Sequence, residues 1–191
     1  MSINLVKGSS IDLRKTTDNE SVLSKVTIGL GWDPSSHSQS FDLDASALLL
    51  QGGKLVSDDD IVYYRKQQHK SGLVYSSGDN LTGAGDGDDE QIIAKLSSLD
   101  SKYDKIIIFV TIYSGESKRQ DFSMIKSAFS RIMDNNGKEL VRHNISKDDN
   151  LSGKCSYEFV ELNRKGDTWE VNVLDKAHST SSITDVANLY K

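Results

Sequence analysis

The sequence predicts a mostly β protein, a β-sandwich of two sheets with a few short helices, one of them at the C-terminus. Short runs of β-branched and aromatic residues follow one another closely along the chain. The run KIIIFVTIY (105–113) is apolar on both faces for most of its length, which is typical of a central strand. Few long helical patterns separate these runs. Strands in such direct succession favour a sandwich over an α/β sheet.

The other strands are expected from alternation and from turn signals. VTIGLG alternates apolar and small residues, and LDASALLL begins with alternation and ends as a buried run. The turn RKGD separates two strand-like runs, which indicates a hairpin. In chain order, strands are expected over 26–31, 43–50, 61–64, 73–77, 105–113, 158–162 and 168–174.

The segment DFSMIKSAFSRIMDNNGKELVRHNI allows two interpretations. Its apolar positions between 122 and 133 have helical spacing. Yet NNG followed by KELVRHNI has the pattern of a turn and a second strand, which would make AFSRIMD the first strand of a hairpin. From the residues themselves, both interpretations stay open.

The C-terminal helix is expected from a capping pattern. Ser182 precedes Asp185 by three residues in SSITDVANLYK, which resembles the start of a capping box. We therefore expect a short helix in this tail.

Composition restricts the classes of partner and compartment. The formal charge of −5 and a pI of about 5.4 argue against nucleic acid, because phosphate binding needs a basic surface. There is no run of 18 apolar residues and no apolar leader near the N-terminus, so neither a membrane span nor a secretory signal is expected. A single cysteine, Cys155, matches a reducing compartment and is interpreted as a core residue. We expect a cytoplasmic protein.

The acidic stretch GDNLTGAGDGDDE (78–90) is the strongest functional signal. It places five acids and four glycines within thirteen residues, and ionised carboxylates this close together repel one another. Upstream, Asp42 and Asp44 in FDLDAS would point to the same face of a strand, about 7 Å apart, with Leu43 facing the core. Two carboxylates on an apolar strand are costly unless a cation lies between them. Oxygen donors of this kind suit calcium.

The loop's other residues fit the same interpretation. Glycines at 83, 85 and 87 allow positive φ and can turn carbonyls inward, while Asn80 and Thr82 add neutral oxygens. The stretch is not an EF-hand, because Leu81, Gly83 and Ala84 occupy positions that an EF-hand loop gives to acids and glycine. It is not a phosphate loop either, since acids surround its glycines.

The motifs VTIGLGWDP, FDLDASALLL, GDNLTGAGDGDDE, KIIIFVTIY and AFSRIMDNNGKELVRHNIS together resemble the TerD family of tellurite-resistance and stress-response proteins. The resemblance implies one domain over 1–191, with a divergent C-terminal segment at 176–191. It implies a β-sandwich and, typically, two calcium ions bound without an EF-hand. It also implies a helical turn at DFSMI before a strand at AFSRIMD.

The resemblance assigns calcium ligands to the strand 43–50 region and to the acidic loop. Asp33 in GWDP also matches the family pattern, and a turn role before Pro34 is an equal alternative. Ala84 and Ser114 stand where family members often carry acids, which puts the second ion in question, so one or two are expected. The expected ligands are Asp42, Asp44, Asp79, Asn80, Asp88, Asp89 and Glu90, with backbone carbonyls at Leu81, Gly83 and Gly85.

The expected function is therefore calcium binding in a stress response, without catalysis and with protein partners in a stress-response complex. One alternative is calcium-dependent attachment to a membrane surface, for which Leu81 is the candidate apolar contact in the loop. A second is a nucleotide-binding module, because some family members, from slime moulds, are described as cAMP-binding. A third is a metal-dependent phosphohydrolase, in which Lys118 and Arg119 would contact phosphate.

Overall fold

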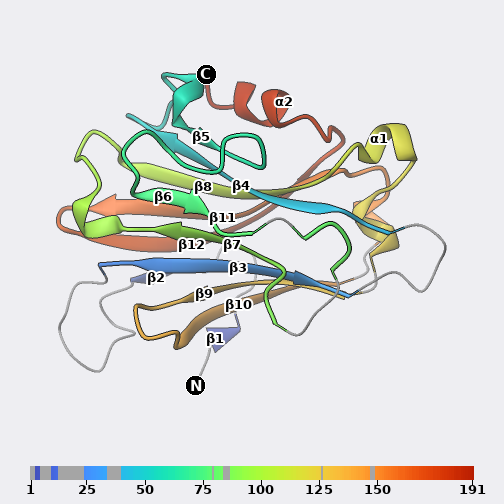
Figure 1. Cartoon of the computed structure of the whole chain (residues 1–191), viewed down its shortest axis with the longest axis horizontal. Helices are drawn as coiled ribbons and strands as arrows, with labels where there is room; N and C mark the ends of the chain where they lie inside the picture. Colours follow the sequence, from blue (N-terminus) through green and yellow to red (C-terminus); the bar gives the residue numbers. More distant parts are fainter. Residues whose placement is uncertain are drawn as a thin grey trace.

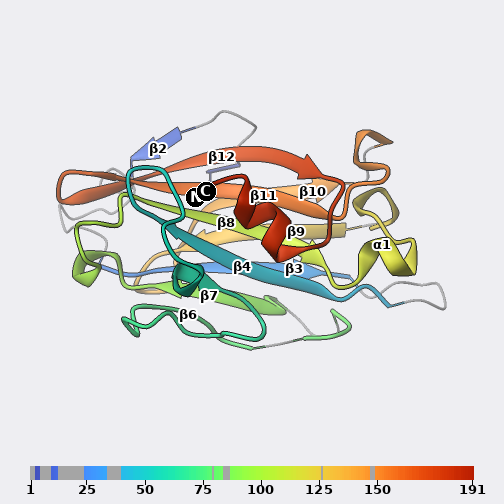
Figure 2. The same ribbon diagram turned by 90° about the horizontal axis from the view of Figure 1, so that it is seen from above.

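Two six-stranded sheets lie face to face in the computed structural model (Figure 1 and Figure 2). The structure describes residues 3–4, 10–12, 24–33, 40–78, 80–83, 87–125, 127–146 and 149–191. The first sheet has the order β1 (Ile3–Asn4), β10 (Glu139–Ser146), β9 (Ser127–Met133), β3 (Val26–Trp32), β7 (Glu90–Ala94) and β6 (Val74–Ser76). The second has the order β2 (Ser10–Asp12), β12 (Thr168–His178), β11 (Ser156–Lys165), β8 (Lys105–Ile112), β4 (Leu43–Leu50) and β5 (Ile61–Val62).

Helices are short. The α-helices are α1 (Gly115–Lys118) and α2 (Ile183–Asn188), and 3-10 turns cover Asp58–Asp60, Leu96–Ser98, Phe122–Met124 and Asp149–Leu151. Helix α2 lies against the outer face of the second sheet (Figure 1). The sandwich with a C-terminal helix is thus confirmed. No helix within the described residues has the length and hydrophobicity of a membrane span.

Strands β4 and β8 are buried on both faces, as the apolar run 105–113 predicts for β8. The inward residues of β4, such as Leu43 and Leu49, join the main core between the sheets. Its outward residues Leu48 and Leu50 pack instead with Val186 of α2 in a second apolar cluster. Helix α2 therefore covers a second, smaller core on the outside of the sandwich.

The ambiguous segment forms a hairpin after a single helical turn. Phe122–Met124 is a 3-10 turn, and β9 pairs with β10 in antiparallel register from Met133 to Ser127. The helical interpretation from the apolar spacing is therefore wrong, and the arrangement implied by the family resemblance is correct.

The remaining expected elements are found with shifted ends. The hairpin around RKGD is longer than expected, because β11 and β12 extend to Ser156 and His178. Strand β7, which begins at Glu90 at the end of the acidic stretch, was not among the expected strands. Helix α2 begins as predicted, with the Ser182 hydroxyl accepting a hydrogen bond from the Asp185 amide.

Candidate functional site

The described part of the acidic loop is organised by Asn80. Its side-chain oxygen accepts hydrogen bonds from the amides of Thr82 and Gly83, both at 3.0 Å. Its Nδ2 atom donates to Oδ1 of Asp89 at 2.7 Å. Asn80 thus closes the turn at the start of the loop and ties it to the acids at its end.

Two of the glycines have the backbone conformation that the sequence predicts. Gly83 has a φ of +68° and Gly87 a φ of +98°, both in the region that favours glycine. A side chain at Gly83 would also collide with the indole of Trp32. The glycine at this position therefore allows the loop to pack directly on β3, while Gly85 lies outside the described residues.

Asp89 lies where β3 ends. Its Oδ2 atom accepts a hydrogen bond from the backbone amide of Trp32 at 2.9 Å. Burial raises the pKa of Asp89; the Trp32 amide opposes this effect, while the negative charges of Asp88 and Asp33 add to it. Asp33 is thus close enough to act on this carboxylate electrostatically.

Asp88 turns away from the loop and lies across β3. Its Oδ1 atom is 2.7 Å from Nε of Arg131, and its Oδ2 accepts a hydrogen bond from Gln91 at 2.9 Å. The side chain of Asp88 is 1% exposed. It passes over Gly29, where a Cβ atom would collide with the carboxylate. The glycine in β3 therefore makes room for an ion pair that joins Asp88, just before β7, to Arg131 of β9 across β3.

Glu90 bridges the two sheets. Its carboxylate is buried, and Oε2 accepts a hydrogen bond from the backbone amide of Ala45 at 2.7 Å. The neighbouring Asp44 is 3% exposed and lines a cavity on the outer face of the second sheet with Thr111, its register partner on β8. Leu43 faces the main core, as the alternation predicts.

The structure brings part of the expected ligand set together. Asn80 contacts Asp89, and Glu90 reaches the strand that carries Asp44. Asp42 precedes β4, and its carbonyl accepts a hydrogen bond from the Tyr113 amide at 2.8 Å. Leu81 is exposed. Asp79 and Gly85 fall outside the described residues. Within the described ranges, no three His, Cys, Asp or Glu side chains are grouped as a metal site.

The donor chemistry nevertheless fits the calcium that the family resemblance implies. The acids at 88, 89 and 90 are consecutive, and the loop offers carboxylate, amide and carbonyl oxygens, which are the ligands calcium takes. In the described arrangement, however, both oxygens of Asp88 and both of Asp89 already accept hydrogen bonds from protein donors. Calcium at Asp88 would compete with the guanidinium of Arg131 for the same carboxylate.

Sequence reasoning missed the residues that hold these acids. Trp32, Gln91 and Arg131 supply the donors, and Gly29 supplies the space. A glycine within the alternating run VTIGLG was a usable signal, because glycine inside a strand often marks a close approach. Nothing in the spacing of Asp88 and Arg131 indicates their contact.

The other candidate groups lie elsewhere. Lys118 and Arg119 are exposed at the end of α1, and Nζ of Lys118 lies 5.1 Å from the ring centroid of Tyr113. Cys155 is buried, and its thiol donates to the carbonyl of Gln120. Burial raises the pKa of the Cys155 thiol, and the charges of Glu116 and Asp121 add to this effect. These surroundings match the core role expected for the cysteine.

The fold defines a class, the β-sandwiches of two six-stranded sheets, and sequence comparison assigns the family. The TerD domain family matches residues 1–190. The chain is 36% identical to the tellurium resistance protein TerX of Serratia marcescens, covering 98% of this chain and 99% of that one. It is also 36% identical to the stress response protein SCP2 of Bacillus subtilis, covering 100% of both.

Solved structures agree on the fold. A homologue of the telluride resistance protein TerD from Streptomyces coelicolor A3(2) superposes with a TM-score of 0.71, at 19% identity, covering 88% of this chain and 98% of that one. The chain belongs to the TerD family, whose matched relatives are named as tellurium-resistance and stress-response proteins.

Proposed function

We propose that the chain is a stress-response protein without catalysis of its own, and that it binds calcium through the acidic loop and the neighbouring end of β4. The observation that carries the proposal is the state of Asp89. It stands between the buried acids Asp88 and Glu90 in the sequence, and its carboxylate is partly desolvated and repelled by Asp88 and Asp33. A divalent cation would relieve that repulsion.

Calcium would be held by Asp88, Asp89 and Glu90 of the loop and by Asp42 and Asp44 of the β4 region. When bound, it would supply positive charge to these acids. In the described structure, the cation next to Asp88 is the side chain of Arg131. Binding restricted to the folded state stabilises it by about 2.7 kcal/mol at a hundredfold excess over Kd. The proposal therefore predicts a response of stability to calcium.

Calorimetric titration and thermal melting test the proposal. Calcium at millimolar concentration is expected to raise Tm, and a chelator to reverse the rise. The double variant Asp88→Asn, Asp89→Asn is expected to lose both the heat of binding and the shift. The matched control is Asp58→Asn, Asp59→Asn, which removes two adjacent charges outside the loop. Identical melting curves with calcium and with chelator would rule the proposal out.

Calcium-dependent contact with a membrane surface is a second candidate, favoured by one observation. Leu81, in the described part of the acidic loop, is 58% exposed. An exposed apolar side chain beside a bound cation could enter the headgroup region of anionic lipid. Co-sedimentation with phosphatidylserine vesicles, with calcium and with chelator, tests this candidate. It predicts that Leu81→Ser reduces sedimentation and leaves the calcium heat unchanged.

A further inference from the structure

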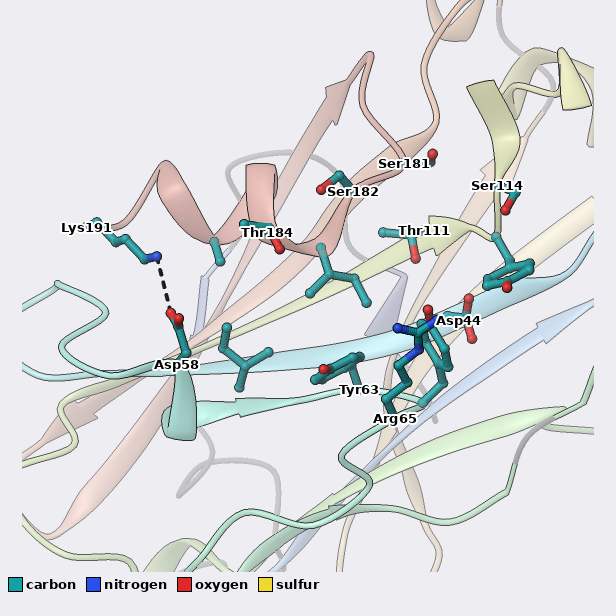
Figure 3. Close-up of a pocket in the computed structure, with 15 residues that line it drawn as sticks. Asp44, Asp58, Tyr63, Arg65, Thr111, Ser114, Ser181, Ser182, Thr184 and Lys191 are labelled. Atoms are coloured by element: carbon teal, nitrogen blue, oxygen red, sulfur yellow. Dashed lines mark ion pairs between the residues drawn. The ribbon is translucent and has the colours of Figure 1, made fainter. Parts of the chain in front are cut away.

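A cavity of about 410 Å³ lies on the outer face of the second sheet, under α2 (Figure 3). Strands β4 and β8 form its floor, the segment 61–65 forms one wall and the residues 181–187 form the other. Its volume falls in the range of small-molecule sites. Apart from Asp44, it contains none of the acids assigned to calcium.

Carboxylates lie at the two ends of this cavity. Figure 3 shows Asp44 at one end and Asp58 at the other, with Tyr63 between them. Asp44 is 3% exposed, so its carboxylate is held against the sheet, whereas Asp58 is on the rim. A ligand that satisfies both ends needs two positive charges separated by a spacer.

The middle of the cavity is suited to an aliphatic spacer. Ile61 of β5 and Ile183 and Ala187 of α2 face it from the two sides. Hydroxyl groups of Thr111, Ser182 and Thr184 also line it. Methylene groups would pack on the apolar side chains, and an N–H group along the chain would find hydroxyl acceptors.

The Asp44 end carries aromatic rings whose faces already attract cations. Tyr64 and Tyr113 meet edge to face, with ring centroids 5.6 Å apart. The guanidinium of Arg65 lies 5.4 Å from the Tyr64 centroid, and the ammonium of Lys118 lies 5.1 Å from the Tyr113 centroid. A buried carboxylate beside tyrosine rings is a recognised arrangement for binding organic cations.

The Asp58 end already holds an alkylammonium group of the chain itself. Nζ of Lys191 lies 3.2 Å from Oδ1 of Asp58 (Figure 3). Lysine presents an ammonium on a four-carbon stem, as an aliphatic diamine does. The intramolecular pair shows that this end of the cavity accepts such a group, and the partly exposed Lys191 can leave it.

We propose that this cavity binds a linear aliphatic diamine or polyamine, with one ammonium at Asp44 beside Tyr64 and Tyr113 and the other at Asp58 in place of Lys191. Arg65 and Lys191 act as resident cations that the ligand displaces. An anionic ligand would meet the buried carboxylate of Asp44, which disfavours it. The inference stands without calcium at the acidic loop, but it shares Asp44 with the proposed calcium site, so an ammonium group and calcium are alternative occupants of that carboxylate.

Calorimetric titration with spermidine and putrescine, in a chelator to remove calcium and at low salt, tests the proposal. Saturable binding is expected, and Asp44→Asn is expected to weaken it at least tenfold. Arg65→Gln is expected to strengthen binding several-fold, because a competing cation is removed. Asp59→Asn is the matched control, since Asp59 neighbours Asp58, does not line the cavity and should leave the affinity unchanged.

A second variant keeps the test decisive if Asp44→Asn fails to fold. Tyr113 is 38% exposed, so Tyr113→Leu removes the ring face with little effect on packing, and it should weaken binding several-fold. Asp88→Asn, Asp89→Asn should retain amine binding even where calcium binding is lost. The proposal is overturned by an absence of amine binding, by affinity that neither Asp44→Asn nor Tyr113→Leu lowers, or by preferential binding of citrate or phosphate that Arg65→Gln abolishes.

Discussion

The Nε atom of Arg131 on β9 lies 2.7 Å from Oδ1 of Asp88, directly over Gly29 of the intervening strand β3. Arg131 also reaches Glu139 at 3.3 Å. This guanidinium therefore links the end of the acidic stretch to the first sheet. Among the described residues, Arg131 is the cation that pairs with an acid of the loop, namely Asp88.

Removal of this guanidinium should destabilise the fold. Arg131→Met leaves the Asp88 carboxylate buried without its ion-pair partner. Breaking a buried pair costs about 3–5 kcal/mol, and the partial exposure of Arg131 reduces the expected loss to about 2 kcal/mol. Urea unfolding measures it. The control Arg142→Met, which breaks a more exposed pair with Glu139, should cost less than about 1 kcal/mol; equal losses would contradict the assignment.

The same variant should bind calcium more tightly than the unmodified chain. If calcium at Asp88 displaces Arg131, the ion pair is lost on binding and its free energy opposes affinity. Each 1.4 kcal/mol of opposition corresponds to about a tenfold change in Kd. Calorimetry on Arg131→Met should therefore give a Kd about tenfold lower. Weaker binding would show that Arg131 supports the loop conformation instead of competing with calcium.

A buried network around Asp60 predicts stability loss in acid. Burial would raise the pKa of Asp60, but hydrogen bonds from Tyr103 at 2.8 Å, from His69 at 3.1 Å and from Lys70 at 3.2 Å outweigh it and lower the pKa. A depressed folded-state pKa contributes stability above the unfolded value, about 3.9, and this contribution is lost as the pH falls through the folded value.

This contribution can be isolated with the variant Asp60→Asn. The free energy of unfolding is measured for the variant and for the unmodified chain at several pH values between 6 and 2. The difference between the two proteins should shrink as the pH falls below about 4. Asp100→Asn, which removes an exposed acid outside this network, is the control variant. A difference for Asp60→Asn that does not vary with pH would contradict the assignment.

The outer core under α2 should be sensitive to truncation at one face of the helix. Val186 is fully buried against the second sheet, whereas Leu189 is 58% exposed. Val186→Ala should lower the unfolding free energy by about 1–2 kcal/mol, since it leaves a cavity, and Leu189→Ala by less than about 0.5 kcal/mol. Chemical unfolding monitored by circular dichroism distinguishes the two. Equal effects would mean that α2 contributes little to the cooperative fold.

Periodicity could not decide the form of the segment from 122 to 133 for a physical reason. In β9, Ala128 and Ile132 face the core, but Phe129 on the opposite face is covered by the guanidinium of Arg142, 4.1 Å from its ring centroid. Apolar residues therefore occupy both faces of the strand, and the alternation that identifies a strand is hidden. The turn residues NNG instead indicate a hairpin, and the strands on either side of them, β9 and β10, form one.

The acidic site was predictable in composition and only partly in arrangement. The positive φ of Gly83 and Gly87 and the inward position of Leu43 follow from local rules. The contacts of Asp88 and Glu90 do not, because their partners Arg131 and Ala45 lie 43 and 45 positions away. Arg131 is brought near by strand pairing within the first sheet, and Ala45 by the packing of the two sheets. Two carboxylates only two positions apart in the sequence, Asp88 and Glu90, therefore contact different sheets.

Glu90 has one further consequence for the behaviour of the protein in concentrated solution. β5 pairs with β4 at Ala47 and Leu48. At Ala45, outside this paired stretch, the backbone amide of β4 donates its hydrogen bond to the Glu90 carboxylate. A side chain thus takes the place that an additional strand would fill. Since unpaired strand edges recruit strands from other molecules, we expect this carboxylate to disfavour edge-to-edge self-association.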